Sequence, residues 1–322
     1  FAPPPVRFTP MPPADDDVAA AAEAIRAAKR PLIVAGGGVL YAEATGALRA
    51  FADAHGMPVA ETQAGKGALS WDHPLQQGAI GVTGAAAANA CASEADVVLA
   101  VGTRLQDFTT GSHSLCAQAR LESLNVNAFD ALKWRGVPVR ADAGLGLEAL
   151  SRALGGWRAD DAWTASAHER GDRWRDEVLR ITGVRDVPLP YDGEVIGAIQ
   201  RGVADSPGDD VVVCAAGSLP GELHKLWRVA TPGGYHVEYG YSCMGYEIAG
   251  GIGVKMAHPD REVVVMVGDG SYLMLNSEIA TSVMLGRKLV IVVQDNRGYG
   301  CINRLQKAVG GAPFNNLFAD CL

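Results

Sequence analysis

Short runs of consecutive apolar residues recur along this chain of 322 residues, separated by stretches with helical patterning. A strand buried on both faces shows no polar alternation, and such strands are typical of parallel sheets covered by helices. The sequence therefore predicts an α/β fold with doubly wound parallel sheets. The expected strands are Pro31–Ala35, Val97–Val101, Leu124–Val126, Val211–Cys214, Val263–Val267 and Leu289–Val293, with one helix running from glycines 36–38 to about His55 and another ending at Leu285.

The alternation of strands and helices is interrupted between residues 157 and 190. Three tryptophans stand among many charged residues there, and Pro188 and Pro190 end the stretch. We expect this segment to connect two domains, at residues 15–156 and 191–322, by one or two helices. Residues 1–14 contain six prolines and are expected to form a linker.

Composition argues against several kinds of partner. The formal net charge is -8 and the chain has no run of Lys or Arg, so nucleic acid and anionic membrane surfaces are not expected to bind. No apolar stretch approaches the ~20 residues that span a bilayer. The six cysteines are scattered without a Cys-x-x-Cys pair, which indicates reduced thiols and a cytoplasmic protein.

Polar residues follow two successive strands near the C-terminal end. The strand Val263–Val267 is followed by Gly268-Asp269-Gly270, and the next strand is followed by Asp295-Asn296. Asn296 lies 27 residues after Asp269. A single crossover helix would bring both strand ends to one edge of the sheet. Carboxylate, amide and backbone carbonyl oxygens there suit Mg²⁺ bound to a diphosphate. The alternative is that Gly-Asp-Gly only forms a turn.

This pattern, with Glu278-Ile279-Ala280-Thr281 on the intervening helix, resembles the thiamine diphosphate motif of the acetolactate synthase and pyruvate decarboxylase superfamily. The resemblance implies thiamine diphosphate and Mg²⁺ as cofactors. It assigns the metal to Asp269, Asn296 and the backbone carbonyl of Gly298, and it places Gly268, Gly270 and Ser271 at the diphosphate. Family members commonly have Asn-Asn where this chain has Asp295-Asn296.

Two further segments fit the same superfamily. Gly217-Ser218 falls where the first cofactor loop lies, and Ser242-Cys243-Met244-Gly245-Tyr246 resembles the segment that holds thiamine bent. By this resemblance Met244 lies beneath the bend, and the Ser242 carbonyl accepts a hydrogen bond from the aminopyrimidine. The alternative for Met244 is ordinary core packing.

The first domain resembles the Rossmann-like central domain of the superfamily at Val101–Leu105 and Leu124–Asn127. Some relatives bind FAD or another nucleotide in that domain. Gly36-Gly37-Gly38 lacks the full Gly-x-Gly-x-x-Gly spacing, so a structural role is favoured over dinucleotide binding.

Within the superfamily, Gly268–Gln306 and Asn125–Trp134 are similar to the trihydroxycyclohexane-1,2-dione hydrolase branch of inositol catabolism. That branch implies hydrolytic C–C cleavage of a cyclic polyol dione to a deoxy-glucuronic acid, in a homodimer or homotetramer with the active site between subunits. Arg297, Asn303, Arg304 and Gln306 are candidates for substrate contact by proximity. The alternatives are a carboligase of the acetolactate synthase or glyoxylate carboligase type, and a non-catalytic nucleotide-binding α/β protein.

The superfamily activates thiamine with a glutamate from a separate pyrimidine-binding domain. Nothing in residues 1–322 resembles that domain, so we expect the glutamate upstream of Phe1 and no catalysis by residues 1–322 alone. The last residues, Asn315 to Leu322, suggest a cofactor domain truncated at its C-terminus.

Overall fold

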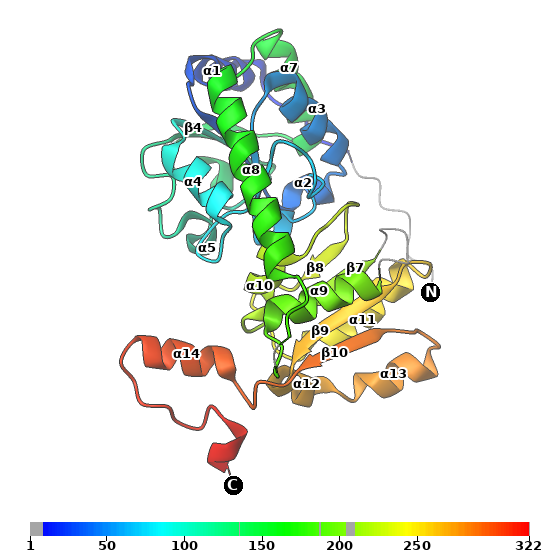
Figure 1. Cartoon of the computed structure of the whole chain (residues 1–322). Coiled ribbons are helices and arrows are strands. Elements are labelled where there is room, and N and C mark those ends of the chain that lie inside the picture. Colours follow the sequence, from blue (N-terminus) through cyan, green and yellow to red (C-terminus); the bar gives the residue numbers. More distant parts are fainter. Residues whose placement is uncertain (1–8, 135, 187, 204–209, 322) are drawn as a thin grey trace. The chain divides into compact units, whose positions relative to one another are not determined.

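The computed structural model describes residues 9–134, 136–186, 188–203 and 210–321, and the chain divides into two compact units (Figure 1). The central unit comprises Phe1–Leu69 and His73–Trp174. The second unit comprises Ser70–Asp72 and Arg175–Leu322. Each unit has its own parallel sheet with helices wound around it, which confirms the predicted α/β class.

The central unit contains a six-stranded parallel sheet in the order β3-β2-β1-β4-β5-β6. The chain starts in the middle of this sheet, winds out to one edge, returns and winds out to the other, as in doubly wound folds. The strands are β1 (Pro31–Ala35), β2 (Val59–Glu61), β3 (Gln76–Ala79), β4 (Val97–Val101), β5 (Arg120–Leu124) and β6 (Val137–Val139).

Helices cover the central sheet, and the longer ones, such as α1, α3 and α7, bury an apolar stripe. In α1, Val18, Ala21, Ala22 and Ile25 are buried at helical spacing, and Asp15–Asp17 occupy the first turn, where acidic side chains interact favourably with the helix dipole. The helices of this unit before α8 are α1 (Asp15–Ala27), α2 (Gly37–Tyr41), α3 (Thr45–His55), α4 (Ala86–Glu94), α5 (Asp107–Thr110), α6 (Ala128–Leu132) and α7 (Ala143–Leu154), with a 3₁₀ turn at Gln63–Gly65.

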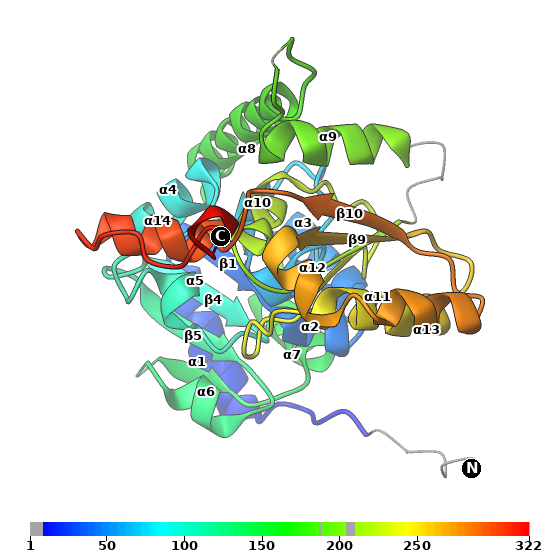
Figure 2. The same ribbon diagram turned by 90° about the horizontal axis from the view of Figure 1, so that it is seen from below.

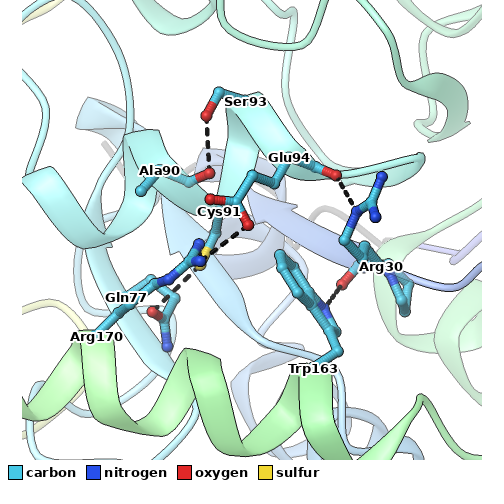
Figure 3. A network of polar contacts seen from close by, with 9 residues as sticks. Arg30, Gln77, Ala90, Cys91, Ser93, Glu94, Trp163 and Arg170 are labelled. Atoms are coloured by element: carbon cyan, nitrogen blue, oxygen red, sulfur yellow. Dashed lines mark hydrogen bonds and ion pairs between the residues drawn. The ribbon is translucent and has the colours of Figure 1, made fainter.

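The long helix α8 (Asp161–Ile181) follows the central sheet in the chain, and side chains of its first half bind residues of the central unit. Arg170 lies 2.8 Å from the Glu94 carboxylate of α4, and Trp163 donates from Nε1 to the Pro31 carbonyl at 2.9 Å (Figure 3). The buried indole of Trp163 thus joins the core, and α8 contributes to the central unit up to Trp174. The division between the two units falls inside this helix, within the segment 157–190.

The second unit contains a four-stranded parallel sheet in the order β10-β9-β7-β8. Alternate residues of its central strands point to opposite faces, and Val263 and Val265 pack against Ile248 of α11. Figure 2 shows α9 on one side of β9 and β10, with α11 and α13 on the other. The elements are α9 (Asp192–Gly202), β7 (Val211–Cys214), α10 (Leu219–Leu226), β8 (Tyr235–Val237), α11 (Tyr246–Ala257), β9 (Val263–Gly268), α12 (Asp269–Leu275), α13 (Glu278–Met284), β10 (Val290–Gln294) and α14 (Gly300–Ala308), followed by a 3₁₀ turn at Phe318–Cys321.

Several elements differ from the sequence expectations. The helix expected to run to His55 is two helices, α2 and α3, because Glu43 adopts a left-handed φ of 52° between them. The helix expected to end at Leu285 is likewise two, α12 and α13. The strand expected at Leu124–Val126 instead ends at Leu124, and Asn125 begins a loop.

Strands β2, β3 and β6 were not expected from the sequence, since each has only three or four residues and two of them contain Glu or Gln. Among the described residues, no helix is both long enough and apolar enough to cross a membrane.

Candidate functional site

The four strands of the second unit are parallel, so the loops after their carboxyl ends share one edge of the sheet. From β7 the chain passes to β8 on one side and then to β9 and β10 on the other. Such a switch in strand order opens a crevice at the carboxyl edge, which is the usual ligand position in open α/β sheets. The cofactor and metal residues expected from the sequence lie on these four loops or at the strand ends and helix starts that border them. They are Gly217 and Ser218 after β7, Ser242 and Met244 after β8, Gly268–Ser271 at β9, and Asn296 and Gly298 after β10.

Asp269 lies at the centre of this edge, as the first residue of α12, and is 8% exposed. Its Oδ2 atom accepts a hydrogen bond from the backbone N–H of Gly298 at 2.9 Å. Its Oδ1 atom is buried and has no hydrogen-bond partner within the described parts of the chain. A buried carboxylate oxygen without a partner is costly, and a bound cation would satisfy it.

Gly298 is held close to Asp269 and Gly270. Its φ of 137° is an angle that glycine adopts and other residues rarely do. A Cβ on Gly298 would lie 2.5 Å from the Asn316 carbonyl oxygen. The Gly298 carbonyl oxygen lies 3.4 Å from the position that a Cβ on Gly270 would take. A carboxylate oxygen and a backbone carbonyl thus occur together at this strand end, and both are ligands that Mg²⁺ accepts.

Asn296 forms no hydrogen bond with Asp269 in the described parts of the chain. Its side chain is exposed, and its amide lies 3.0 Å from where a Cβ on Gly300 would stand, against the start of α14. The neighbouring Asp295 lines a cavity of about 520 Å³ together with Asp269. Asp295 also accepts from the Arg297 backbone N–H at 3.0 Å. The other residues around this cavity are Tyr272, Leu273, Arg297, Phe318 and Ala319.

No cluster of three His, Cys, Asp or Glu side chains suited to a metal occurs among the described residues. One carboxylate oxygen of Asp269 and the carbonyl of Gly298 would leave further positions around a metal to water and ligand oxygens. This is the behaviour of Mg²⁺ at phosphate groups.

The loop after β8 carries Ser242 and Met244. Ser242 has a left-handed φ of 52°, which is strained for a residue other than glycine, and Gly245 has a φ of 89°. The Glu238 carboxylate accepts from the N–H groups of Tyr241 at 3.0 Å and Cys243 at 2.5 Å. Burial raises the pKa of Glu238, but these hydrogen bonds outweigh it and hold the pKa below its ordinary value. Met244 is 36% exposed at this edge, so it is not a core residue of this unit.

A buried glutamate that the sequence reasoning did not single out joins two of these loops. Glu247, in the first turn of α11, is 1% exposed and lies 2.8 Å and 2.9 Å from the Ser271 hydroxyl through its two carboxylate oxygens. The Gly245 N–H donates to both Ser271 Oγ and Glu247. A single acid in the otherwise apolar, glycine-rich helix 246–254 was the available sequence signal.

Gly217 and Ser218 complete the edge. Gly217 has a φ of 83° and no atom within 4 Å of the position of an added Cβ, so the loop is open at this point. Ser218 precedes α10, and its carbonyl accepts from Gly221 and Glu222. The backbone N–H groups of Gly270 and Ser271 lie in the first turn of α12, where helix geometry supplies no acceptor.

The corresponding edge of the central sheet is closed. Gly36 donates to the Val101 carbonyl at 2.8 Å and Gly38 to the Gly102 carbonyl at 2.9 Å, so the turn after β1 lies directly on the turn after β4. A Cβ on Gly38 would stand 2.6 Å from the Gly102 Cα. The turns after β1 and β4 therefore pack backbone against backbone, with no room for a side chain at Gly36 or Gly38.

Comparison with known proteins gives two family matches. The family model "Thiamine pyrophosphate enzyme, central domain" matches residues 18–150, and "Thiamine pyrophosphate enzyme, C-terminal TPP binding domain" matches residues 215–319. Thiamine pyrophosphate is another name for thiamine diphosphate.

Curated relatives named 3D-(3,5/4)-trihydroxycyclohexane-1,2-dione hydrolase are similar along nearly the whole chain. The protein from Geobacillus thermodenitrificans is 46% identical, over 94% of this chain and 50% of its own length. The proteins from Bacillus cereus and Bacillus thuringiensis are 41% and 40% identical, each over 95% of this chain and 51% of its own length. The chain thus spans about half the length of the curated relatives it matches.

Proposed function

Because the chain belongs to the thiamine pyrophosphate enzymes, with their central and C-terminal cofactor-binding domains, we propose that its protein hydrolyses a C–C bond of trihydroxycyclohexane-1,2-dione. The names of the relatives at 40% to 46% identity support this substrate. Cleavage between the two carbonyl carbons with uptake of one water gives one carboxylic acid and one aldehyde. Since the carbons form a ring, both groups stay in one open-chain product, a deoxy-glucuronic acid of inositol catabolism.

The single observation that carries the cofactor proposal is the buried Oδ1 of Asp269, which has no hydrogen-bond partner among the described residues. We assign Mg²⁺ to Asp269, the Gly298 carbonyl and Asn296, whose exposed side chain would have to turn from Gly300 toward the metal. Such a rotation is compatible with the ordinary mobility of an exposed side chain.

The remaining edge residues are assigned to the organic cofactor. The N–H groups of Gly270 and Ser271 would donate to the diphosphate, and Gly268 leaves room for it. Gly217 and Ser218 would border the diphosphate from the loop after β7. Met244 would support the thiamine and the Ser242 carbonyl would accept from its aminopyrimidine. When bound, thiamine diphosphate supplies a nucleophilic carbon and an electron sink for the broken C–C bond.

The polyol substrate needs polar groups at the cavity beside Asp269. Of the four candidates named from the sequence, Arg297 lines that cavity. Gln306 is engaged by the side chain of Asn316, while Asn303 has a buried Oδ1 without a partner among the described residues. We therefore favour Arg297 over Gln306 for substrate contact.

We further propose that the activating glutamate comes from a pyrimidine-binding domain outside residues 1–322, in a cytoplasmic homodimer or homotetramer with the active site between subunits. The two matched models are the central and C-terminal domains of the family, and neither is that pyrimidine-binding domain. Absence of dione hydrolysis by residues 1–322 alone stays a prediction.

The test uses the protein expressed from its complete gene. Calorimetric titration with thiamine diphosphate should show binding that requires Mg²⁺, and Asp269→Asn should weaken it by at least ~100-fold because the variant lacks the metal's carboxylate. Asp260→Asn is the matched control, since Asp260 is exposed before the opposite end of β9. Binding that is unaffected by Asp269→Asn would contradict the assigned site.

Activity assays separate the alternatives. Ring opening of the cyclic dione with no acetolactate from pyruvate and no condensation of glyoxylate supports the hydrolase. Condensation of either keto acid without dione cleavage would instead support a carboligase. A protein with no Mg²⁺-dependent binding of thiamine diphosphate would be the non-catalytic α/β protein.

A further inference from the structure

Three segments of the second unit meet at one buried carboxylate. Glu247 lies in the first turn of α11, Ser271 in the first turn of α12, and Gly245 ends the loop that carries Met244. Glu247 and Ser271 are 1% and 4% exposed. The Ser271 hydroxyl lies 2.8 Å and 2.9 Å from the two Glu247 oxygens, and the Gly245 N–H lies 2.8 Å from Ser271 Oγ and 3.1 Å from Glu247 Oε2.

These contacts use the Ser271 hydroxyl fully. Its single hydrogen is donated to the carboxylate, since an ionised carboxylate can only accept, and its oxygen accepts from Gly245. The hydroxyl therefore has no hydrogen left for a diphosphate oxygen. Any donation from Ser271 to a ligand comes from its backbone N–H, and its side chain serves to hold the neighbouring loop.

The loop that is held in this way has a strained backbone. Ser242 has a φ of 52°, which is strained for a residue other than glycine, so the loop needs contacts that keep it in this shape. Glu238 provides them at its start through Tyr241 and Cys243. Glu247 and Ser271 provide them at its end, immediately after Met244.

Glu247 is buried with few groups that could offset its desolvation. No basic side chain pairs with it among the described residues, and its hydrogen-bond donors are one hydroxyl and one backbone N–H. A buried carboxylate without a cationic partner costs more to desolvate than an apolar side chain would at the same place. The neighbouring residues of α11 include buried Ile248 and Ile252, which shows that apolar residues fit that helix.

We propose that Glu247 is a positioning residue that locks the Met244 loop onto the Gly270–Ser271 turn, so that the thiamine end and the diphosphate end of the cofactor site keep a fixed separation. This inference rests on the proposed function, because it assigns the two ends of the clamp to the two ends of thiamine diphosphate. Glu247, Ser271 and the Gly245 N–H act as one unit, called the Glu247 clamp below.

The test compares two ligands in the complete protein. Mg²⁺-pyrophosphate reports the diphosphate end alone, and Mg²⁺-thiamine diphosphate reports both ends. Glu247→Gln places an amide N–H₂ where the carboxylate accepts from Gly245 or Ser271, and Ser271→Ala removes the link between the loops. Each variant should lose about tenfold in affinity for thiamine diphosphate and much less for pyrophosphate, as expected for one lost buried hydrogen bond.

Matched controls come from the same unit. Glu194→Gln alters a buried glutamate in the first turn of α9 that accepts from the Tyr191 N–H. Ser282→Ala removes a buried hydroxyl of α13 that donates to the Arg287 carbonyl. Both controls should lower the melting temperature while leaving the ratio of the two affinities unchanged.

A double variant, Glu247→Gln with Ser271→Ala, checks that the residues act together. Its loss of thiamine diphosphate affinity should be about that of one single variant, since either change opens the same clamp. If both single variants keep the wild-type ratio of affinities and lose only melting temperature, the clamp is merely structural and the inference is wrong. Failure of the wild-type protein to bind thiamine diphosphate at all would overturn the proposed function instead.

Discussion

Glu122 and Glu61 of the central unit show how burial changes single side chains in this fold. Glu122 is fully buried on β5, and burial raises its pKa to about 7 although Arg120 lies 2.7 Å from the carboxylate and lowers it. Burial likewise raises the pKa of Glu61 to about 7, against the lowering effect of Lys66 and of N–H donors from Leu69 and Gly67. Both carboxyls bind a proton more tightly in the folded protein than in the unfolded chain.

The raised pKa of Glu122 makes the free energy of unfolding depend on pH. Because the folded pKa of Glu122 exceeds the ordinary value of 4.5, its contribution to the free energy of unfolding falls as the pH rises from about 4.5 to about 7. The fall is at most about 1.4 kcal/mol per pH unit for one such group. Glu122→Gln removes the titration, so its stability relative to wild type should increase across this window and level off above it.

Calorimetric unfolding at several pH values between 4 and 8 measures this difference. Glu148→Gln, at a 59% exposed side chain of α7, is the control and should show no such trend. A wild-type stability that rises relative to Glu122→Gln between pH 5 and 7 would contradict the assigned shift.

At the same scale, the sequence singled out Asp269 and gave little sign of Glu247. Asp269 stands between glycines at the end of an apolar strand, a pattern visible in the chain itself. The importance of Glu247 depends on a hydroxyl 24 residues away that only the packing of α12 beside α11 brings within 2.8 Å.

At the scale of turns and strands, local sequence signals compete with packing. Gly36, between β1 and α2, and Gly38, in the first turn of α2, both lie against Gly102 in the turn after β4. Positions beside backbone atoms cannot accommodate a side chain without movement of the main chain.

A pair of glycine substitutions tests this packing. Gly38→Ala would place a Cβ 2.6 Å from the Gly102 Cα, so we expect a loss of about 2 to 4 kcal/mol in stability. Gly46→Ala, in the first turn of α3 with nothing within 4 Å of the added Cβ, should be neutral or stabilise by up to ~1 kcal/mol. Urea unfolding of the two variants makes the comparison, and equal stabilities would show that the two turns can separate freely.

Packing against neighbours also explains the strands that the sequence did not predict, β2, β3 and β6. Strand β3 reads Gln-Gln-Gly-Ala and would not be assigned to a sheet from its residues, yet it pairs with β2, and Gln77 is fully buried. Strand β6 contains Pro138, which an edge strand tolerates because one side of its backbone forms no ladder. Sheet edges are completed by neighbours, so their residues need little strand preference of their own.

On the scale of the whole molecule, the chain forms two compact units, and α8 passes from one into the other after Trp174. Val263–Val267 form the centre of one core, and Leu32–Ala35 with Val98–Val101 form the centre of the other. The proposed cofactor contacts, at Asp269, Met244 and Ser218, all belong to the second unit.

Cofactor binding should therefore stabilise the two units unequally. Thiamine diphosphate with Mg²⁺, at free concentrations about 100 times the Kd, should add about 2.7 kcal/mol to the unit that binds it. Differential scanning calorimetry of the complete protein should show a higher melting temperature for that transition, reversed by EDTA. Asp269→Asn should abolish the shift, and a rise confined to the transition of the central unit would place the cofactor elsewhere.

By itself, the sequence determined the α/β class, the main strands and the placement of Asp269 and Asn296 at one sheet edge, while Gly217, Met244 and Gly298 were added by the resemblance to the thiamine diphosphate motif. These features depend on runs of apolar residues and on the rule that parallel strands end together, both of which are local or topological. The tertiary structure alone decided the close packing of Gly38 against Gly102, the raised pKa values of Glu61 and Glu122, and the Glu247 clamp. Each of these arises from atoms that are far apart in the chain and meet at contact distance, where steric exclusion and desolvation act and where no pattern along the sequence records them.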